Sequence, residues 1–130
     1  RDASTIEGAE IDQRPDKIGA LLVTRGAQFT LAQTGTVLWT PAVGKRCYVT
    51  SYRINARGNT DGIITIFDET DTQNQWVLPP TKYDVVNNSS TIDGEILPIP
   101  YKSSTVGNLI KVTSSTNMDF SVIVRGYEAM

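Results

Sequence analysis

The chain has 130 residues, of which 39% are hydrophobic and 20% charged, and its formal net charge at pH 7 is −2. This length fits one domain, since single cores commonly span about 100–150 residues. No apolar run approaches the roughly 20 residues that a membrane-spanning helix needs, and the slightly acidic balance gives no overall attraction to phosphate backbones. The composition therefore predicts a soluble domain that binds neither membranes nor nucleic acid.

The first segment, residues 1–17, differs in composition from the rest of the chain. It holds three of the 12 basic and five of the 14 acidic side chains, which leaves nine of each in the remainder and places the whole net charge of −2 here. Its large apolar residues are too few to offset the entropy that is lost on ordering. We therefore expect an extended arm that binds a partner through Ile6, Glu7, Glu10, Ile11 and Asp12. A helix capped by Ser4 is the alternative, which Gly8 disfavours.

From residue 18 onward, apolar and polar residues alternate with a period of two, which is typical of half-buried strands. The clearest strand covers residues 48–56. Its pattern predicts an inner face and an outer face, which hold Tyr48, Tyr52, Ile54 and Ala56 and, on the other side, Arg53, Asn55 and Arg57. The sequence "GNTDG" that follows has the residues of a tight turn, so we expect residues 46–69 to form a hairpin.

Further short strands are expected at residues 20–24, 28–32, 36–40, 75–78, 92–99, 109–113 and 120–127. Eight or nine short strands without a helical period predict an all-β sandwich or barrel over residues 18–130. The pairs Pro79–Pro80 and Pro98/Pro100 cannot donate hydrogen bonds to a sheet, so they are expected on edge strands or at strand ends.

The side chains that carry most enzyme chemistry are missing. The chain has no histidine, which removes imidazole bases and imidazole metal ligands. The one cysteine, Cys47, lies within a strand pattern and is expected to be buried and inert. The acidic run Asp68, Glu69 and Asp71 is interpreted as a solvated turn in preference to a calcium loop. We expect no catalytic residue, no metal and no cofactor.

Two tryptophans and two arginines are candidates for an interface or a ligand surface: Trp39, Arg53, Arg57 and Trp76. Exposed aromatic residues on a β-sandwich can stack on sugar rings, but each tryptophan lies in an apolar run that favours packing. Arg53 and Arg57 share one face of their strand. Such a patch on an acidic protein favours contacts with a protein neighbour or with solvent over nucleic acid.

Three stretches, "VLWTPAVGKRCYVTSYRINA", "GIITIFDE" and "NLIKVTSSTNMDFSVIVRGYE", follow one another over residues 36–128. In this order they resemble small β-sandwich proteins of tailed bacteriophages that decorate the capsid or the tail. In that group a "W-T-P-x-x-G-K" turn leads into a long strand, and a "V-x-V-x-G-Y-E" strand closes the chain. These motifs are structural and transfer no catalytic residue.

The resemblance implies a jelly-roll-like antiparallel sandwich and a non-enzymatic structural protein of a bacteriophage virion. It also implies a homo-oligomer, often a trimer, that contacts the major capsid or tail protein and is assembled in the host cytoplasm. The alternative is a carbohydrate-binding or receptor-binding module of the same fold class. An enzyme is the least favoured of the three functions.

Overall fold

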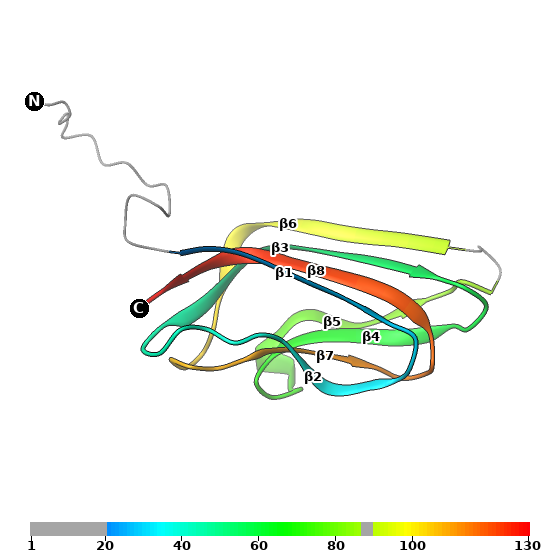
Figure 1. Cartoon of the computed structure of the whole chain (residues 1–130), viewed down its shortest axis with the longest axis horizontal. Coiled ribbons are helices and arrows are strands. Elements are labelled where there is room, and N and C mark those ends of the chain that lie inside the picture. Colours follow the sequence, from blue (N-terminus) through cyan, green and yellow to red (C-terminus); the bar gives the residue numbers. More distant parts are fainter. Residues whose placement is uncertain (1–20, 87–89) are drawn as a thin grey trace, which may run out of the picture.

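The computed structural model describes residues 21–86 and 90–130 (Figure 1). The expected arm, residues 1–17, lies outside the described residues. The described part contains eight strands and a short 3₁₀ helix, in the order β1 (Leu21–Phe29), β2 (Gln33–Trp39), β3 (Arg46–Arg57), β4 (Gly62–Asp68), η2 (Gln73–Gln75), β5 (Trp76–Tyr83), β6 (Ser90–Lys102), β7 (Ile110–Ser114) and β8 (Asp119–Ala129). No helix among these residues is long and apolar enough to cross a membrane.

The strands form two antiparallel four-stranded sheets with the orders β1-β8-β3-β6 and β2-β7-β4-β5. Figure 1 shows the two sheets as layers that face each other. The chain changes sheet at every connection between successive strands except that between β4 and β5. This order is that of an eight-stranded jelly roll. The expectation of an all-β, antiparallel, jelly-roll-like sandwich is confirmed.

The expected hairpin over residues 46–69 is wrong. Strands β3 and β4 exist, but β3 pairs with β6 and β8, whereas β4 pairs with β5 and β7 in the other sheet. The "GNTDG" stretch therefore carries the chain across the sandwich. Asp61 secures this crossing, because its Oδ1 accepts hydrogen bonds from the backbone N–H groups of Val85 and Val86 at 2.7 and 2.8 Å.

The alternation along β3 is confirmed for most of its length and wrong at its beginning. Tyr52, Ile54 and Ala56 are buried, as expected, but Tyr48 is only partly buried and stacks on Tyr127 of β8, with ring centroids 4.8 Å apart. The cause is a register shift between Val49 and Ser51 in the pairing of β3 with both its neighbours. Such a bulge adds one residue to a strand and reverses which side chains face inward.

The two strands expected at residues 20–24 and 28–32 are one strand, β1. It pairs with β8 in an unbroken register from Leu21 to Phe29. Gly26 lies between the two expected strands, but β1 lies at the edge of its sheet, where a glycine weakens the strand without ending it.

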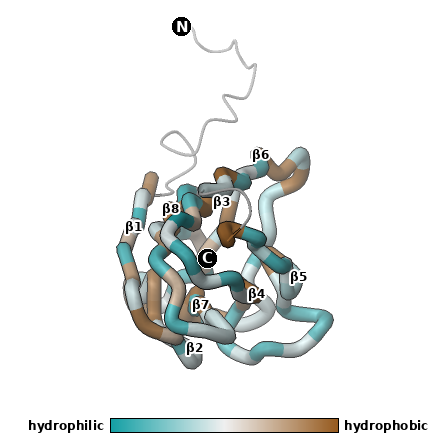
Figure 2. The backbone as a smooth tube through the Cα atoms, turned by 90° about the vertical axis from the view of Figure 1, so that its right-hand side faces the viewer, coloured by the Kyte–Doolittle hydropathy of each residue, from teal (hydrophilic) through white to brown (hydrophobic). Residues whose placement is uncertain are grey.

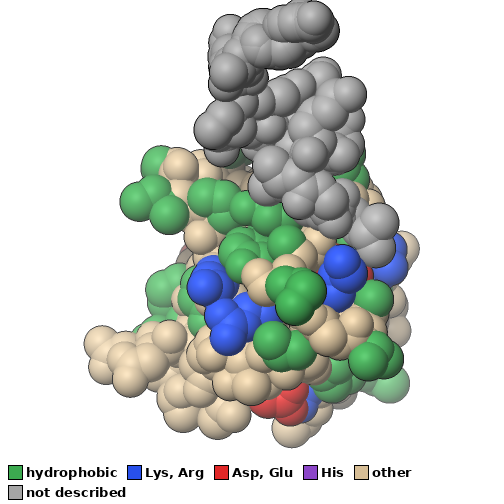
Figure 3. Space-filling view, turned by 90° about the vertical axis from the view of Figure 1, so that its left-hand side faces the viewer, with side chains coloured by type: hydrophobic (Ala, Val, Ile, Leu, Met, Phe, Trp, Pro, Cys, Tyr) green, Lys and Arg blue, Asp and Glu red, His purple; other side chains and the backbone are tan. Residues whose placement is uncertain are grey.

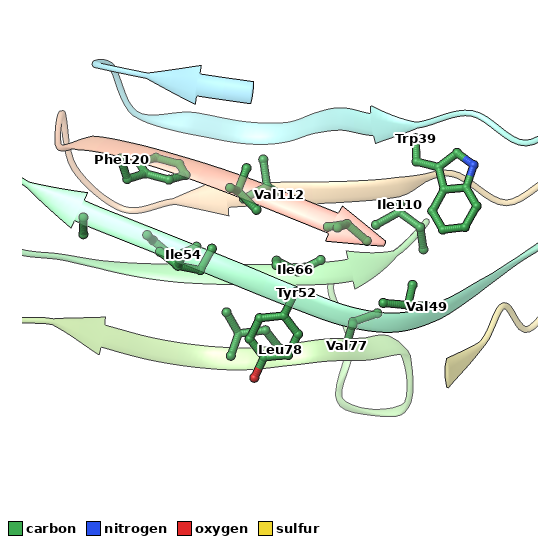
Figure 4. Packing of buried hydrophobic residues seen from close by; sticks show 14 of the residues in the cluster. Trp39, Val49, Tyr52, Ile54, Ile66, Val77, Leu78, Ile110, Val112 and Phe120 are labelled. Carbon is green, nitrogen blue, oxygen red and sulfur yellow. The ribbon is translucent and has the colours of Figure 1, made fainter. Parts of the chain in front are cut away.

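The core lies between the two sheets and runs the length of the sandwich (Figure 4). Trp39 lies at one end of the view and Phe120 at the other, with Ile54 and Ile66 between them, one from each sheet. All four side chains are fully buried. Each such side chain adds about 1.5–3 kcal/mol of hydrophobic stabilisation.

Both proline pairs lie on edge strands, as the sequence predicts. Pro79 and Pro80 belong to β5, and Pro98 and Pro100 belong to β6, the outermost strands of their sheets. Pro98 and Pro100 also fall within residues 97–100, which have no partner in the register between β3 and β6. Their missing N–H groups therefore remove no bond from that ladder.

Gly126, the glycine of the closing motif, lies where two strands approach closely. A Cβ atom there would overlap the backbone carbonyl of Tyr48. We expect Gly126→Ala to lower the free energy of unfolding by about 3 kcal/mol or more, because the backbone beside the bulge must move. Gly26 is the matched control, since a Cβ there would lie 3.4 Å from the nearest atom, a side-chain carbon of Ile123. Urea unfolding of both variants measures the difference, and equal losses would contradict this account.

Candidate interaction surface

The outer face of the β1-β8-β3-β6 sheet carries both arginines that the sequence singled out. Arg53 is exposed, and Arg57 is partly exposed and forms an ion pair with Asp119 of β8 at 3.5 Å. Arg53 pairs in register with Ile123 of β8 and with Gly94 of β6. The two arginines therefore share one face, as expected.

A third arginine joins this face from β8. Arg125 pairs with Ser51, so it is a diagonal neighbour of Arg53, and such neighbours are about 7–8 Å apart. The sequence analysis did not single out Arg125. Its place in "V-x-V-R-G-Y-E" marked it as outward-facing, but the pairing that brings β8 beside β3 is not visible in the alternation of either strand.

An open groove of about 580 Å³ crosses this face over β3 and β6. Its lining includes Arg53, Arg125, Ile92, Gly94 and Ile96. Gly94 has no side chain and lies between two isoleucines that are 59% and 82% exposed. The groove therefore has an apolar wall on either side of a hollow, with two cations beside it.

Strand β6 exposes three isoleucines, whereas its Leu97 and Tyr101 are partly buried and pack against the core. None of its 13 residues is buried, and Ile99 is 82% exposed in addition to the two isoleucines of the groove. Figure 2 shows hydrophobic stretches on β6 at the edge of its sheet. Basic and hydrophobic side chains also adjoin one another at the end of the sandwich that carries the C-terminus (Figure 3). Exposed apolar side chains that gather on one element are typical of an interaction surface.

Trp39 does not belong to this surface, so its place among the expected interface residues is wrong. The side chain is fully buried, and its indole N–H donates a hydrogen bond of 2.7 Å to Oε2 of Glu128. The other carboxylate oxygen of Glu128 accepts a bond of 3.0 Å from the backbone N–H of Ala42. The apolar run "VLW" thus marks the core, as the packing interpretation of this tryptophan predicts.

Trp76 is partly exposed but lies in the other sheet, on β5. Its indole N–H donates to Oδ1 of Asp71 at 2.7 Å. The structure therefore separates Trp76 from Arg53 and Arg57 and ties it to a local turn. The five arm residues Ile6, Glu7, Glu10, Ile11 and Asp12 lie outside the described residues.

The acidic run that begins at the last residue of β4 does not converge on one point. Asp68 is fully buried and accepts from the hydroxyl of Tyr101 at 3.0 Å and from the backbone N–H of Ser104 at 2.7 Å. Glu69 accepts from the backbone N–H of Leu109 at 3.0 Å and pairs with Lys111, and these donors lower its pKa. Over residues 21–86 and 90–130 no group of three or more Cys, Asp or Glu side chains is arranged to hold a metal ion.

Cys47 is fully buried, as the sequence predicts. Burial, together with the carboxylates of Glu128 and Asp68, raises the pKa of its thiol to about 12. The Sγ atom lies 3.7 Å from the carbonyl oxygen of Asn108. The thiol therefore stays protonated and unreactive at neutral pH.

The chain matches no protein-family model and no curated protein. Among solved structures it is similar to a chain in the capsid asymmetric unit of cyanophage Pam1, with 15% identity, a TM-score of 0.46 and coverage of 98% of each chain. It is also similar to a chain in the virus-like particle of the extra small virus of the giant freshwater prawn Macrobrachium rosenbergii. That likeness has 12% identity and a TM-score of 0.37, and it covers 85% of this chain and 79% of the other.

The two tryptophans allow a matched test of the buried carboxylate. We expect Trp39→Phe to lower the free energy of unfolding by about 2–4 kcal/mol, because it removes a donor from a carboxylate that water does not reach. Trp76→Phe removes a bond of the same length to Asp71 at the surface, so we expect a loss of about 1 kcal/mol or less. Denaturant unfolding compares them, and a larger loss for Trp76→Phe would refute the difference.

The Cys47 thiol gives a second test. We expect a thiol reagent at pH 8 to label the native protein no faster than the protein unfolds, since the pKa of Cys47 is about 12 and the side chain is buried. Cys47→Ala should lower the free energy of unfolding by about 1–3 kcal/mol without changing the oligomeric state. Rapid labelling of the folded protein would show that the thiol is accessible.

Proposed function

We propose that this chain is a non-enzymatic structural protein of a virion that acts by binding copies of itself and other virion proteins. The observation that carries the proposal is β6, a strand of 13 residues that has no buried side chain and exposes three isoleucines. A strand of this kind at a sheet edge is suited to contact with another protein. The arginines beside it belong to a residue type that is enriched in protein interfaces.

The finer role is decoration or stabilisation of the capsid or tail of a tailed phage. The resemblance of residues 36–128 to sandwich proteins of such phages supports this role. We infer a closed ring, because cyclic symmetry repeats one contact and leaves no surface open for endless addition of subunits. The number of three subunits follows the same resemblance, which implies a trimer. The ring would then bind the major capsid or tail protein, which places the chain in the virion.

The carbohydrate-binding alternative loses the residues that supported it. A sugar platform needs an exposed aromatic face. Trp39 is fully buried, and Trp76 is partly buried and held by Asp71. No other described feature favours a sugar ligand over a protein partner.

A single substitution on β6 tests the proposal. We expect Ile99→Glu to raise the dissociation constant for self-association at least about tenfold, which corresponds to about 1.4 kcal/mol, because a charge replaces an exposed apolar contact. The melting temperature should stay unchanged, since Ile99 is 82% exposed. Ile63→Glu is the matched control, because Ile63 is 42% exposed on β4 in the opposite sheet. Sedimentation equilibrium measures both constants.

Sedimentation equilibrium at different salt concentrations distinguishes association through apolar contact from association through charge attraction. We expect self-association of the unaltered chain to persist between about 0.1 M and about 1 M NaCl, where the Debye length falls from about 10 to about 3 Å. A chain that sediments as a monomer at every concentration would refute the proposed function. Equal effects of Ile99→Glu and Ile63→Glu would remove β6 from the interface.

A further inference from the structure

We propose that the groove over β3 and β6 receives the acidic N-terminal segment of a neighbouring copy, with Ile11 seated in the hollow above Gly94. The inference rests on the proposed self-association, because it takes the segment from a second copy. It adds a defined receptor for the segment, which the proposed function does not require.

The shape of the groove suits one branched apolar side chain. Gly94 forms a stretch of floor without a side chain, between Ile92 and Ile96 at two residues on either side. In a strand, residues two apart face the same way, so the two isoleucines stand on either side of the glycine. An isoleucine from another chain can contact both walls and the backbone of the floor.

The charge of the groove suits an acidic ligand. Arg53 and Arg125 both line it. No ion pair of either arginine is found within the described residues. Glu95 is the carboxylate in the lining, and its Oε1 already accepts the hydroxyl of Tyr52 at 3.1 Å. Two guanidinium groups against one engaged carboxylate leave an excess of positive charge.

The N-terminal segment has the complementary pattern. Residues 1–17 hold five acidic and three basic side chains, and Ile11 stands between Glu10 and Asp12. The segment combines a branched apolar side chain with adjacent carboxylates, and the groove combines an apolar hollow with two arginines on one side of it, on β3 and β8. Arginine is well suited to bind carboxylates through two hydrogen bonds. Ile6 has a carboxylate on one side only, at Glu7, so Ile11 is the better match.

The length of the segment allows it to reach a second copy. The first described residue, Leu21, begins β1 at one edge of the same sheet. Four strands about 4.8 Å apart are about 14 Å wide, whereas the ten residues from Ile11 to Leu21 span up to about 33–36 Å when extended. The reach of Ile11 from Leu21 is therefore more than twice the width of the sheet, so Ile11 can extend beyond its own sandwich.

Charge reversal in the full chain tests the inference. One variant reverses the segment, Glu10→Lys with Asp12→Lys, and another reverses the groove, Arg53→Glu with Arg125→Glu. At about 0.1 M salt, where these charges are not fully screened, we expect each variant alone to self-associate at least tenfold more weakly than the unaltered chain. An equimolar mixture of the two should regain part of the lost affinity, because in a mixed ring of three subunits two of the three grooves meet a segment of opposite charge.

Two further variants complete the design. Carrying all four substitutions in one chain should also restore self-association. The control is Lys45→Glu with Lys82→Glu, which changes the net charge by the same amount as the groove variant but lies outside the groove. It should leave the dissociation constant for self-association within twofold of that of the unaltered chain. If the four-substitution chain recovers but the mixture does not, each groove binds its own segment and the exchange between copies is wrong. If neither recovers, the pairing of segment and groove is wrong.

The outcomes also separate this inference from the proposed function. An unaltered chain that stays monomeric refutes both. Alternatively, the unaltered chain associates, Ile99→Glu weakens the association and neither charge reversal changes it. That result would support the proposed function and refute the groove as the receptor of the segment.

Discussion

A buried carboxylate, Glu128, joins the two sheets at one end of the sandwich. It extends from β8 in one sheet and accepts hydrogen bonds from the indole of Trp39, which ends β2 in the other sheet, and from the backbone of Ala42 in the next turn. A buried charge is strongly unfavourable unless donors surround it, so β8 has little freedom to slip along its neighbours. This contact connects the "W-T-P" turn with the "G-Y-E" strand, two motifs that lie 89 residues apart.

The fixed position of β8 in turn determines what the outer face displays. Gly126 lies opposite Val49, beside the bulge, where a larger residue would strike the backbone of Tyr48. Beyond the bulge the alternation of β3 is reversed, so Arg53 faces outward next to Arg125. Contacts that are buried on the other side of the sheet therefore determine the positions of the two arginines of the groove. The arrangement of charges on this surface depends on the packing of the core.

Local patterns predicted the strands well but not their partners. The alternation in β3 predicts burial directly, because each side chain points to one face of its own strand. The burial of Tyr52 and Ile54 was predicted in this way. The partner of β3 depends on residues far along the chain, so the nearby turn sequence misled the hairpin prediction. Of the surface residues, Arg53 and Arg57 were found by their shared face. Arg125 was missed, since its neighbour Arg53 lies 72 residues away.

Strand β6 combines an apolar face with an edge, and these two features have opposite consequences for assembly. An exposed edge invites pairing with another strand and open-ended growth. Pro98 and Pro100 remove two donors from the stretch of β6 that has no partner in its sheet, so edge pairing there is weakened. Ile92 and Ile96 remain exposed on the outer face of the strand. In the proposed self-association, contact between copies would therefore be directed toward the face, where arginines on β3 and β8 can distinguish one partner from another, because an apolar contact alone carries little directional information.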